Sequence, residues 1–166
     1  MGTLPDPCEM LKSGESVMKK VVASFFLILG LIAGKAHGGD VQEAENMKIK
    51  LSFEGNEVIV RMEDNLAVRQ IVEMLPADFE FSDFAGEEKI ATFPRPVSLA
   101  GVSRGMIAKA GRMFIYAPWG NMGIFYKDHG DRLDQNLIAL GTVEKGLEHL
   151  KSRKNGFFAR LEKTAD

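Results

Sequence analysis

The chain has 166 residues, and its 21 Lys and Arg against 23 Asp and Glu give a formal net charge of only -2. With 45% hydrophobic and 27% charged residues, it cannot be a collagen-like, a highly charged disordered or a multi-spanning membrane protein. Nucleic-acid binders without sequence preference neutralise phosphates with clustered Lys and Arg, so we expect no nucleic-acid partner. The single cysteine, Cys8, excludes an internal disulfide and a Cys-x-x-Cys motif. The composition therefore predicts one ordinary globular domain stabilised by packing.

An apolar segment near the N-terminus predicts a secretory signal peptide at residues 18–38. Lys19 and Lys20 precede an uncharged run over residues 21–34, which is shorter than the roughly 20 apolar residues of a membrane-spanning helix. Small residues then allow cleavage after Gly38, or after Ala36 as the competing choice. A buried helix or an uncleaved anchor is the alternative. We expect an exported protein, periplasmic or secreted, without membrane contact after cleavage.

The segments on either side of this signal are not expected to join the fold. Residues 1–17 read as an upstream extension because Met18 is the better start of a signal, and the choice between Met1 and Met18 stays open. Cys8 would then be absent from the mature chain. Residues 39–46 are polar and predict a flexible leader before a domain at residues 47–163.

Two alternating runs predict a β-hairpin at the start of this domain. Apolar residues occupy every second position over residues 47–53 and again over residues 57–62, with a turn between them. Asp64 or Asn65 can then cap a helix whose apolar residues recur with helical spacing until Pro76 ends it. This helix is expected to pack one face on a sheet.

The middle of the domain alternates short strands with irregular segments. Residues 79–83 and 89–92 predict strands on either side of a turn at 85–88. Two prolines keep residues 93–97 extended and outside any central strand. Residues 101–111, with three glycines, predict a long loop of the kind that often carries function.

The last third of the chain predicts further strands and a second helix. Residues 112–117, 122–127, 137–141 and 157–162 have strand patterns, and Thr142 can cap a helix that contains Val143, Leu147 and Leu150. The total of about eight strands and two helices predicts a mainly β fold, namely a closed or nearly closed barrel.

Four segments in chain order resemble a small bacterial cyclophilin-like family that is largely uncharacterised. They are Gly86-Glu87-Glu88-Lys89-Ile90 leading to Pro94, Tyr116-Ala117-Pro118-Trp119-Gly120-Asn121, Ile124-Phe125-Tyr126, and Leu140-Gly141 leading to Gly146-Leu147. The resemblance implies a cyclophilin-like closed β-barrel whose ends are covered by helices, over nearly all of the mature chain.

The resemblance also raises the possibility of peptidyl-prolyl cis-trans isomerase activity. True cyclophilins carry Phe-His-Arg and Phe-Met-x-Gln-Gly-Gly segments, and this chain has neither. Their catalytic residues therefore have no counterparts here, although Arg95 or Arg104 could supply a donor. We expect a module that binds a small molecule or an extended peptide in the cell envelope, with a divergent isomerase as the alternative and the oligomeric state open.

Six residues are the candidate ligand-binding set: Glu88, Arg95, Tyr116, Trp119, Asn121 and Phe125. The segment 116–121 combines a phenol, an indole N–H and a carboxamide beside a rigid proline, which suits a peptide or a ring-shaped ligand. The alternative is a tight turn in which Trp119 fills the barrel mouth and Asn121 adopts a positive φ.

Charged residues suggest two weaker sites. Glu87, Glu88 and Lys89 could form an acid–base group with Arg95 as an anion clamp, or only a solvated turn with a surface ion pair. The acids at 128, 131 and 134, with His129, lack the spacing of a calcium loop, so a solvated loop is expected. We predict no metal and no cofactor.

Overall fold

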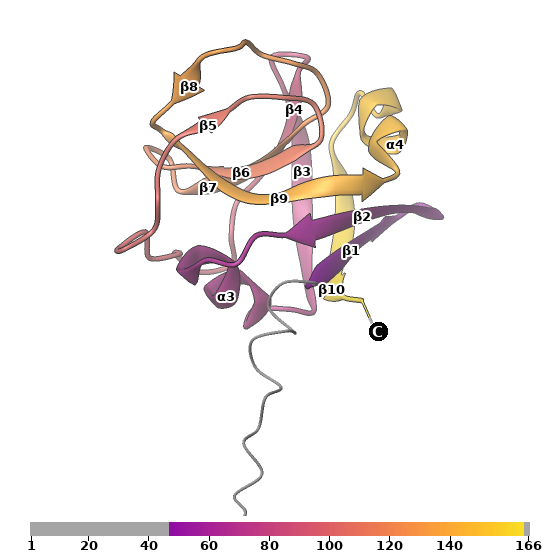
Figure 1. The fold of residues 1–166 in the computed structure, drawn as a ribbon. Coiled ribbons are helices and arrows are strands. Elements are labelled where there is room, and N and C mark those ends of the chain that lie inside the picture. The colour runs from indigo at the N-terminus through magenta and orange to yellow at the C-terminus, as the bar shows by residue number, and fades with distance from the viewer. Residues whose placement is uncertain (1–46, 165–166) are drawn as a thin grey trace, which may run out of the picture. The chain divides into compact units, whose positions relative to one another are not determined.

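The computed structural model describes residues 47–164, which form a closed antiparallel β-barrel (Figure 1). The strands that close it follow the order β1-β10-β3-β4-β7-β6-β9-β2. Their bounds are β1 Lys48–Phe53, β2 Asn56–Met62, β3 Ala77–Phe84, β4 Glu88–Ala91, β6 Arg112–Tyr116, β7 Asn121–Phe125, β9 Leu137–Lys145 and β10 Phe157–Lys163. The expected fold class, a closed barrel of eight strands with two helices, is confirmed, whereas the predicted signal peptide, extension and leader lie outside the described residues.

The first hairpin and the first helix, α3 (Leu66–Val72), form as the sequence predicts. The side chain of Asn65 accepts hydrogen bonds from the backbone N–H groups of Ala67 and Val68, both at 3.0 Å, so Asn65 rather than Asp64 is the N-cap. Neither helix within residues 47–164 is long and apolar enough to cross a membrane.

The barrel interior is filled by one side of each strand. Because side chains alternate across a strand, Met113 and Ile115 of β6 face the same interior as Met122 and Ile124 of β7. These four residues are fully buried in the main core. The residues between them point outward, where a second apolar layer covers them.

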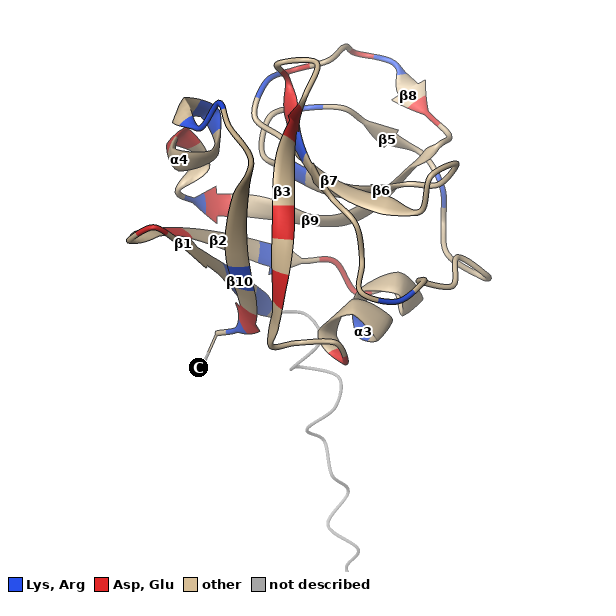
Figure 2. Cartoon of the chain, turned by 180° about the vertical axis from the view of Figure 1, so that it is seen from behind, with Lys and Arg blue, Asp and Glu red and all other residues tan. Residues whose placement is uncertain are grey.

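This second layer is formed by a small sheet outside the barrel. Strands β5 (Met106–Ile107) and β8 (Leu133–Asp134) pair with each other, where the sequence predicted only loop. Beneath them a separate apolar cluster, here called the outer cluster, contains Met106, Ala108, Phe114, Phe125 and Leu137. Strand β7 is therefore buried on both faces, and it carries no charged residue, in contrast to the acidic residues along β3 (Figure 2).

The second helix, α4 (Leu147–Ser152), begins later than predicted. Thr142 and Val143 belong to β9, which continues to Lys145, and the N-cap position is Gly146 in the left-handed region with φ of 85°. A Cβ at Gly146 would lie 2.2 Å from the Glu57 carbonyl oxygen, so the chain can turn here only with glycine. Thr142 as the helix cap was therefore wrong.

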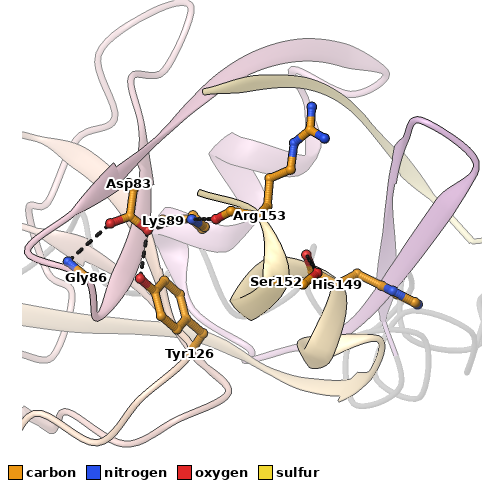
Figure 3. Close-up of polar contacts among 7 residues, drawn as sticks. All are labelled: Asp83, Gly86, Lys89, Tyr126, His149, Ser152 and Arg153. Carbon is orange, nitrogen blue, oxygen red and sulfur yellow. Dashed lines mark hydrogen bonds and ion pairs between the residues drawn. The ribbon is translucent and has the colours of Figure 1, made fainter. Parts of the chain in front are cut away.

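A buried cation lies at the barrel end that α4 covers. Lys89 of β4 is 0% exposed, and its Nζ lies 2.5 Å from Oδ1 of Asp83 and donates to the Arg153 carbonyl at the end of α4 (Figure 3). The Tyr126 hydroxyl donates to the same Asp83 oxygen at 2.7 Å, and the Gly86 N–H donates to the other at 3.1 Å. The charge is thus paired and hydrogen-bonded, as burial of an ammonium group requires.

The pKa values of this cluster follow from its geometry. Partial burial opposes the ionisation of Asp83, but hydrogen bonds from Lys89 and Tyr126 outweigh it and hold the pKa of Asp83 below its usual value. Burial, followed by the hydrogen bond to Asp83, raises the pKa of Tyr126 to about 12. Asp83 therefore stays ionised near neutral pH and balances the Lys89 charge.

Replacing Asp83 should destabilise the barrel strongly. In Asp83→Ala the ammonium group of Lys89 keeps its burial but loses its counter-charge, so we expect the free energy of unfolding to fall by about 3 kcal/mol in urea denaturation. Asp78→Ala is the matched control on the same strand, because the Asp78–Arg160 pair is 64% and 50% exposed. This control should cost less than about 1 kcal/mol. Equal losses in the two variants would show that the Lys89–Asp83 pair contributes no more than a surface pair.

Candidate functional site

A cavity of about 350 Å³ lies on the outer face of the barrel, beside the outer cluster. It is called the outer cavity below. In the sheet, Glu88 of β4 pairs with Phe84 of β3 on one side and with Phe125 of β7 on the other. These three side chains therefore lie on the same outward face. The residues that line it are Phe84, Ala85, Glu87, Glu88, Ile90, Phe114, Tyr116, Trp119, Asn121, Phe125, His129, Asp134 and Leu137.

Five of the six predicted ligand-binding residues line this one cavity. Glu88 comes from β4, Asn121 and Phe125 come from β7, and Tyr116 and Trp119 come from the end of β6 and the turn that follows it. Their binding role stays a prediction, but the structure brings these side chains together.

Arg95 is not among the lining residues. Its guanidinium lies 3.6 Å from a carboxylate oxygen of Glu73, the residue that ends α3, and both side chains are largely exposed. The extended segment around Arg95 is held beside α3 by two hydrogen bonds between Gln70 and Ser98. The prediction that Arg95 acts as an anion clamp beside Glu88 is therefore wrong, because Arg95 lies next to α3 and does not line the cavity.

The aromatic turn both reverses the chain and lines the cavity. The N–H groups of Trp119 and Gly120 donate to the Tyr116 carbonyl at 3.2 and 2.8 Å, and Gly120 takes the positive φ of 65° that the turn alternative assigned to Asn121. Trp119 is 62% exposed and contacts Phe84 and Tyr116 edge-to-face, at centroid distances of 5.7 and 5.2 Å. Trp119 thus borders the outer cavity and does not fill the barrel mouth.

Two oxygen atoms of residues that line the outer cavity have no hydrogen-bond partner. Oε2 of Glu88 and Oδ1 of Asn121 are both fully buried, and neither is paired with any described residue. Buried polar atoms are nearly always paired, because an unpaired one costs about 1–3 kcal/mol. These acceptors are the chemical feature that distinguishes the cavity from ordinary packing.

The surroundings of Glu88 make it a titrating group near neutral pH. Burial raises the pKa of the Glu88 carboxyl to about 7, against a smaller opposing effect of His129. His129 pairs through Nδ1 with Glu87, and this hydrogen bond raises the pKa of His129. The His129 ring also stacks near Phe125, with 6.1 Å between the centroids. The His129–Glu87 pair therefore lies at the edge of an aromatic cavity.

Gly123 makes room for the floor of the cavity. A Cβ at this position would lie 2.3 Å from Cζ of Phe114 and 3.0 Å from Oε2 of Glu88. The absence of a side chain lets the Phe114 ring lie across β7, where it stacks on Phe125 at a centroid distance of 4.4 Å. Glycine is needed here for close approach and not for a special backbone angle.

The suggested acid–base group is divided between two faces of β4. Glu88 points outward into the cavity, whereas Lys89 points inward and pairs with Asp83. Both the acid–base group and the solvated-turn alternative were therefore wrong for Lys89. In the acidic loop, Asp128 and Asp131 both bind Nζ of Lys109, while His129 pairs with Glu87.

Sequence reasoning missed Phe84 and Phe114 as cavity residues, and it assigned Glu87 and His129 to two separate sites, whereas they pair with each other at the cavity. Phe114 had a signal, because residues 113–115 are all apolar, and a strand without alternation is typical of burial on both faces. His129 had none, since its partner Glu87 is 42 positions away.

Comparison with protein families identifies the chain. The Cyclophilin-like family matches over residues 51–162, from the second half of β1 to the end of β10 but for its last residue. The chain belongs to the cyclophilin-like family. The barrel is therefore that of a cyclophilin-like domain.

A solved structure supports the same fold. This cyclophilin-like chain is similar to the hypothetical protein AF2241 from Archaeoglobus fulgidus, with 20% identity and a TM-score of 0.59. The similarity covers 72% of this chain and 96% of that protein, and at this identity it shows the fold alone. No curated protein matches the chain.

The buried carboxyl of Glu88 should leave a pH signature on stability. Since its pKa is about 7 in the fold and ordinarily about 4.5, the folded state holds a proton that the unfolded state releases between these values. Stability should therefore fall as the pH rises from about 4.5 to 7. We expect Glu88→Gln to remove this decrease, measured as the difference in unfolding free energy between variant and wild type. A difference that does not vary with pH would contradict the assigned burial.

Proposed function

We propose that this cyclophilin-like protein is exported and binds a small ring-shaped ligand in its outer cavity. The observation that carries the proposal is the pair of buried, unpartnered oxygen atoms on Glu88 and Asn121 among aromatic side chains. Ligand sites are typically apolar cavities with a few directed polar groups. A volume of about 350 Å³ lies at the small end of their range, which favours a compact molecule over a long peptide.

Isomerase activity is the alternative, and the cavity gives it less support. True cyclophilins grip the prolyl peptide with an arginine, whereas the described residues that line the outer cavity include no arginine or lysine. The cavity offers acceptors and aromatic faces, which suit recognition of a ligand better than polarisation of a prolyl amide.

Asn121 provides a test that separates binding from folding. Because Oδ1 of Asn121 is unpaired, Asn121→Leu should keep or raise the melting temperature while weakening binding of any ligand found in a screen by about tenfold. Trp119 is the only tryptophan of the chain, so its fluorescence reports occupancy of the cavity.

Phe158→Ala is the control for this screen, because Phe158 is an exposed aromatic residue on β10 that does not line the cavity. It should leave binding unchanged. If no small molecule or short peptide perturbs Trp119, or if Asn121→Leu binds as wild type does, the cavity is not a ligand site. Acceleration of proline-limited refolding by the protein would favour the isomerase instead.

Export rests on the sequence pattern of residues 18–38. We expect full-length chain expressed in a bacterium to appear outside the cytoplasm with Gly39 or His37 at its N-terminus, as read by N-terminal sequencing. Leu29→Arg places a charge in the apolar run and should block processing, whereas Leu4→Arg in the upstream extension should not. An unprocessed cytoplasmic chain would contradict export.

A further inference from the structure

We propose that the ligand of the outer cavity is a flat organic cation with N–H donors, such as an amidinium, a guanidinium or a protonated ring amine. This inference rests on the proposed binding function and names the chemical class that the cavity selects. Three properties of the described residues lead to it: the hydrogen-bond acceptors, the charge of the lining and the aromatic walls.

At pH 8, where Glu88 is ionised, the two free hydrogen-bonding atoms are both acceptors. Oε2 of Glu88 and Oδ1 of Asn121 belong to residues of the adjacent strands β4 and β7 that share the outward face, and Asn121 is two positions from Gly123. The position of a Cβ on Gly123 would be 3.0 Å from Oε2, so this oxygen lies directly over the open floor. A ligand satisfies both atoms only if it presents donors, and N–H groups on a planar cation do so without adding acceptors.

The charge of the lining favours a cation. The groups facing Glu88 are Glu87 from the β3–β4 turn, Asp134 from β8 and His129 from the segment after β7. Glu87 is already paired with His129, which leaves Glu88 as the carboxyl that lines the cavity with a buried oxygen and no ion pair of its own. An anionic ligand would be repelled by the Glu88 carboxylate, and little water would screen the repulsion. A cationic ligand would instead form an ion pair with Glu88.

The aromatic side chains that line the cavity also favour a cationic ligand. Five aromatic side chains surround the cavity, namely Phe84, Phe114, Tyr116, Trp119 and Phe125. Aromatic rings attract cations through their negative faces, and enclosure by several rings beside a carboxyl group is a common way to hold organic ammonium groups. A flat cation can pack on these rings while its edge donates to Glu88 and Asn121.

Three molecules of nearly equal shape test the class directly: benzamidine, a cation; benzamide, its neutral counterpart; and benzoate, an anion. We expect titration of the purified protein at pH 8, followed by Trp119 fluorescence and calorimetry, to show benzamidine binding at least about tenfold more tightly than benzamide, with benzoate weakest. Glu88→Gln should weaken benzamidine binding by about tenfold or more without weakening benzamide.

Glu80→Gln is the matched control, since it removes one carboxylate from the exposed face of β3 outside the outer cavity. Glu80→Gln should not change the preference for benzamidine over benzamide. An unchanged preference would exclude a general effect of net charge. Melting temperatures show whether each variant is folded, and Asn121→Leu provides a second cavity variant that should also weaken benzamidine.

The outcomes separate this inference from the proposed function. Binding of benzamide or benzoate as tight as that of benzamidine, or an unchanged preference in Glu88→Gln, overturns the cation class while keeping a ligand site. Failure of benzamidine to bind at millimolar concentration also overturns it. If in addition no compound of the broader screen perturbs Trp119, the binding function itself fails.

Discussion

The buried charge of Lys89 is a constraint on which both the closure of the barrel and its outer surface depend. An ammonium group without exposure to water must be surrounded by acceptors, and here they come from two places: the Asp83 carboxylate on β3 and the Arg153 carbonyl at the end of α4. The Tyr126 hydroxyl supports the first of them by donating to Asp83. These contacts fix the end of the barrel to the helix that covers it. They also determine which side chains of β4 point into the barrel. Because side chains alternate along a strand, Lys89 can point inward only if its neighbours Glu88 and Ile90 point outward.

The outer cavity is thus a consequence of how β4 is oriented. Glu88 is forced onto the outer face of the sheet, where the outer cluster and the β5–β8 strands bury it. Burial there raises its pKa and leaves one of its oxygen atoms without a partner. A stable inner pair and an unsatisfied outer carboxyl therefore occur one residue apart, on opposite faces of the same strand.

Local chemistry explains which parts of the fold the sequence could predict. The first hairpin and the Asn65 cap depend on neighbouring residues, so alternation and capping patterns were sufficient. The start of α4 could not be found in this way, because Gly146 is required by its approach to the Glu57 carbonyl, a contact between distant segments. Thr142 looked like a cap, yet it pairs with Arg61 and Arg112 within the sheet.

The same distinction applies to the candidate site. Tyr116, Trp119 and Asn121 were singled out because one short segment contains them, and Glu88 because it lies in a recognisable turn. Arg95 was included for its charge, but Pro94 and the contacts with α3 keep it beside Glu73. Burial of the outer face of β7 could not be predicted, because it depends on residues 106–108 folding back over the barrel, and no local pattern indicates this.

The described chain enters and leaves the barrel at one place, since the Thr164 N–H donates to the Lys48 carbonyl at 3.1 Å and β1 pairs with β10 (Figure 1). Strand β3 starts beside this point, with Ala77 opposite Leu161, and runs away from it to Phe84 at the outer cavity. A surface, a tag or a second domain attached at either end would therefore be on the side opposite the cavity. Immobilised or tandem copies of this domain should present their cavities outward, which suits it as a scaffold for an oriented sensor.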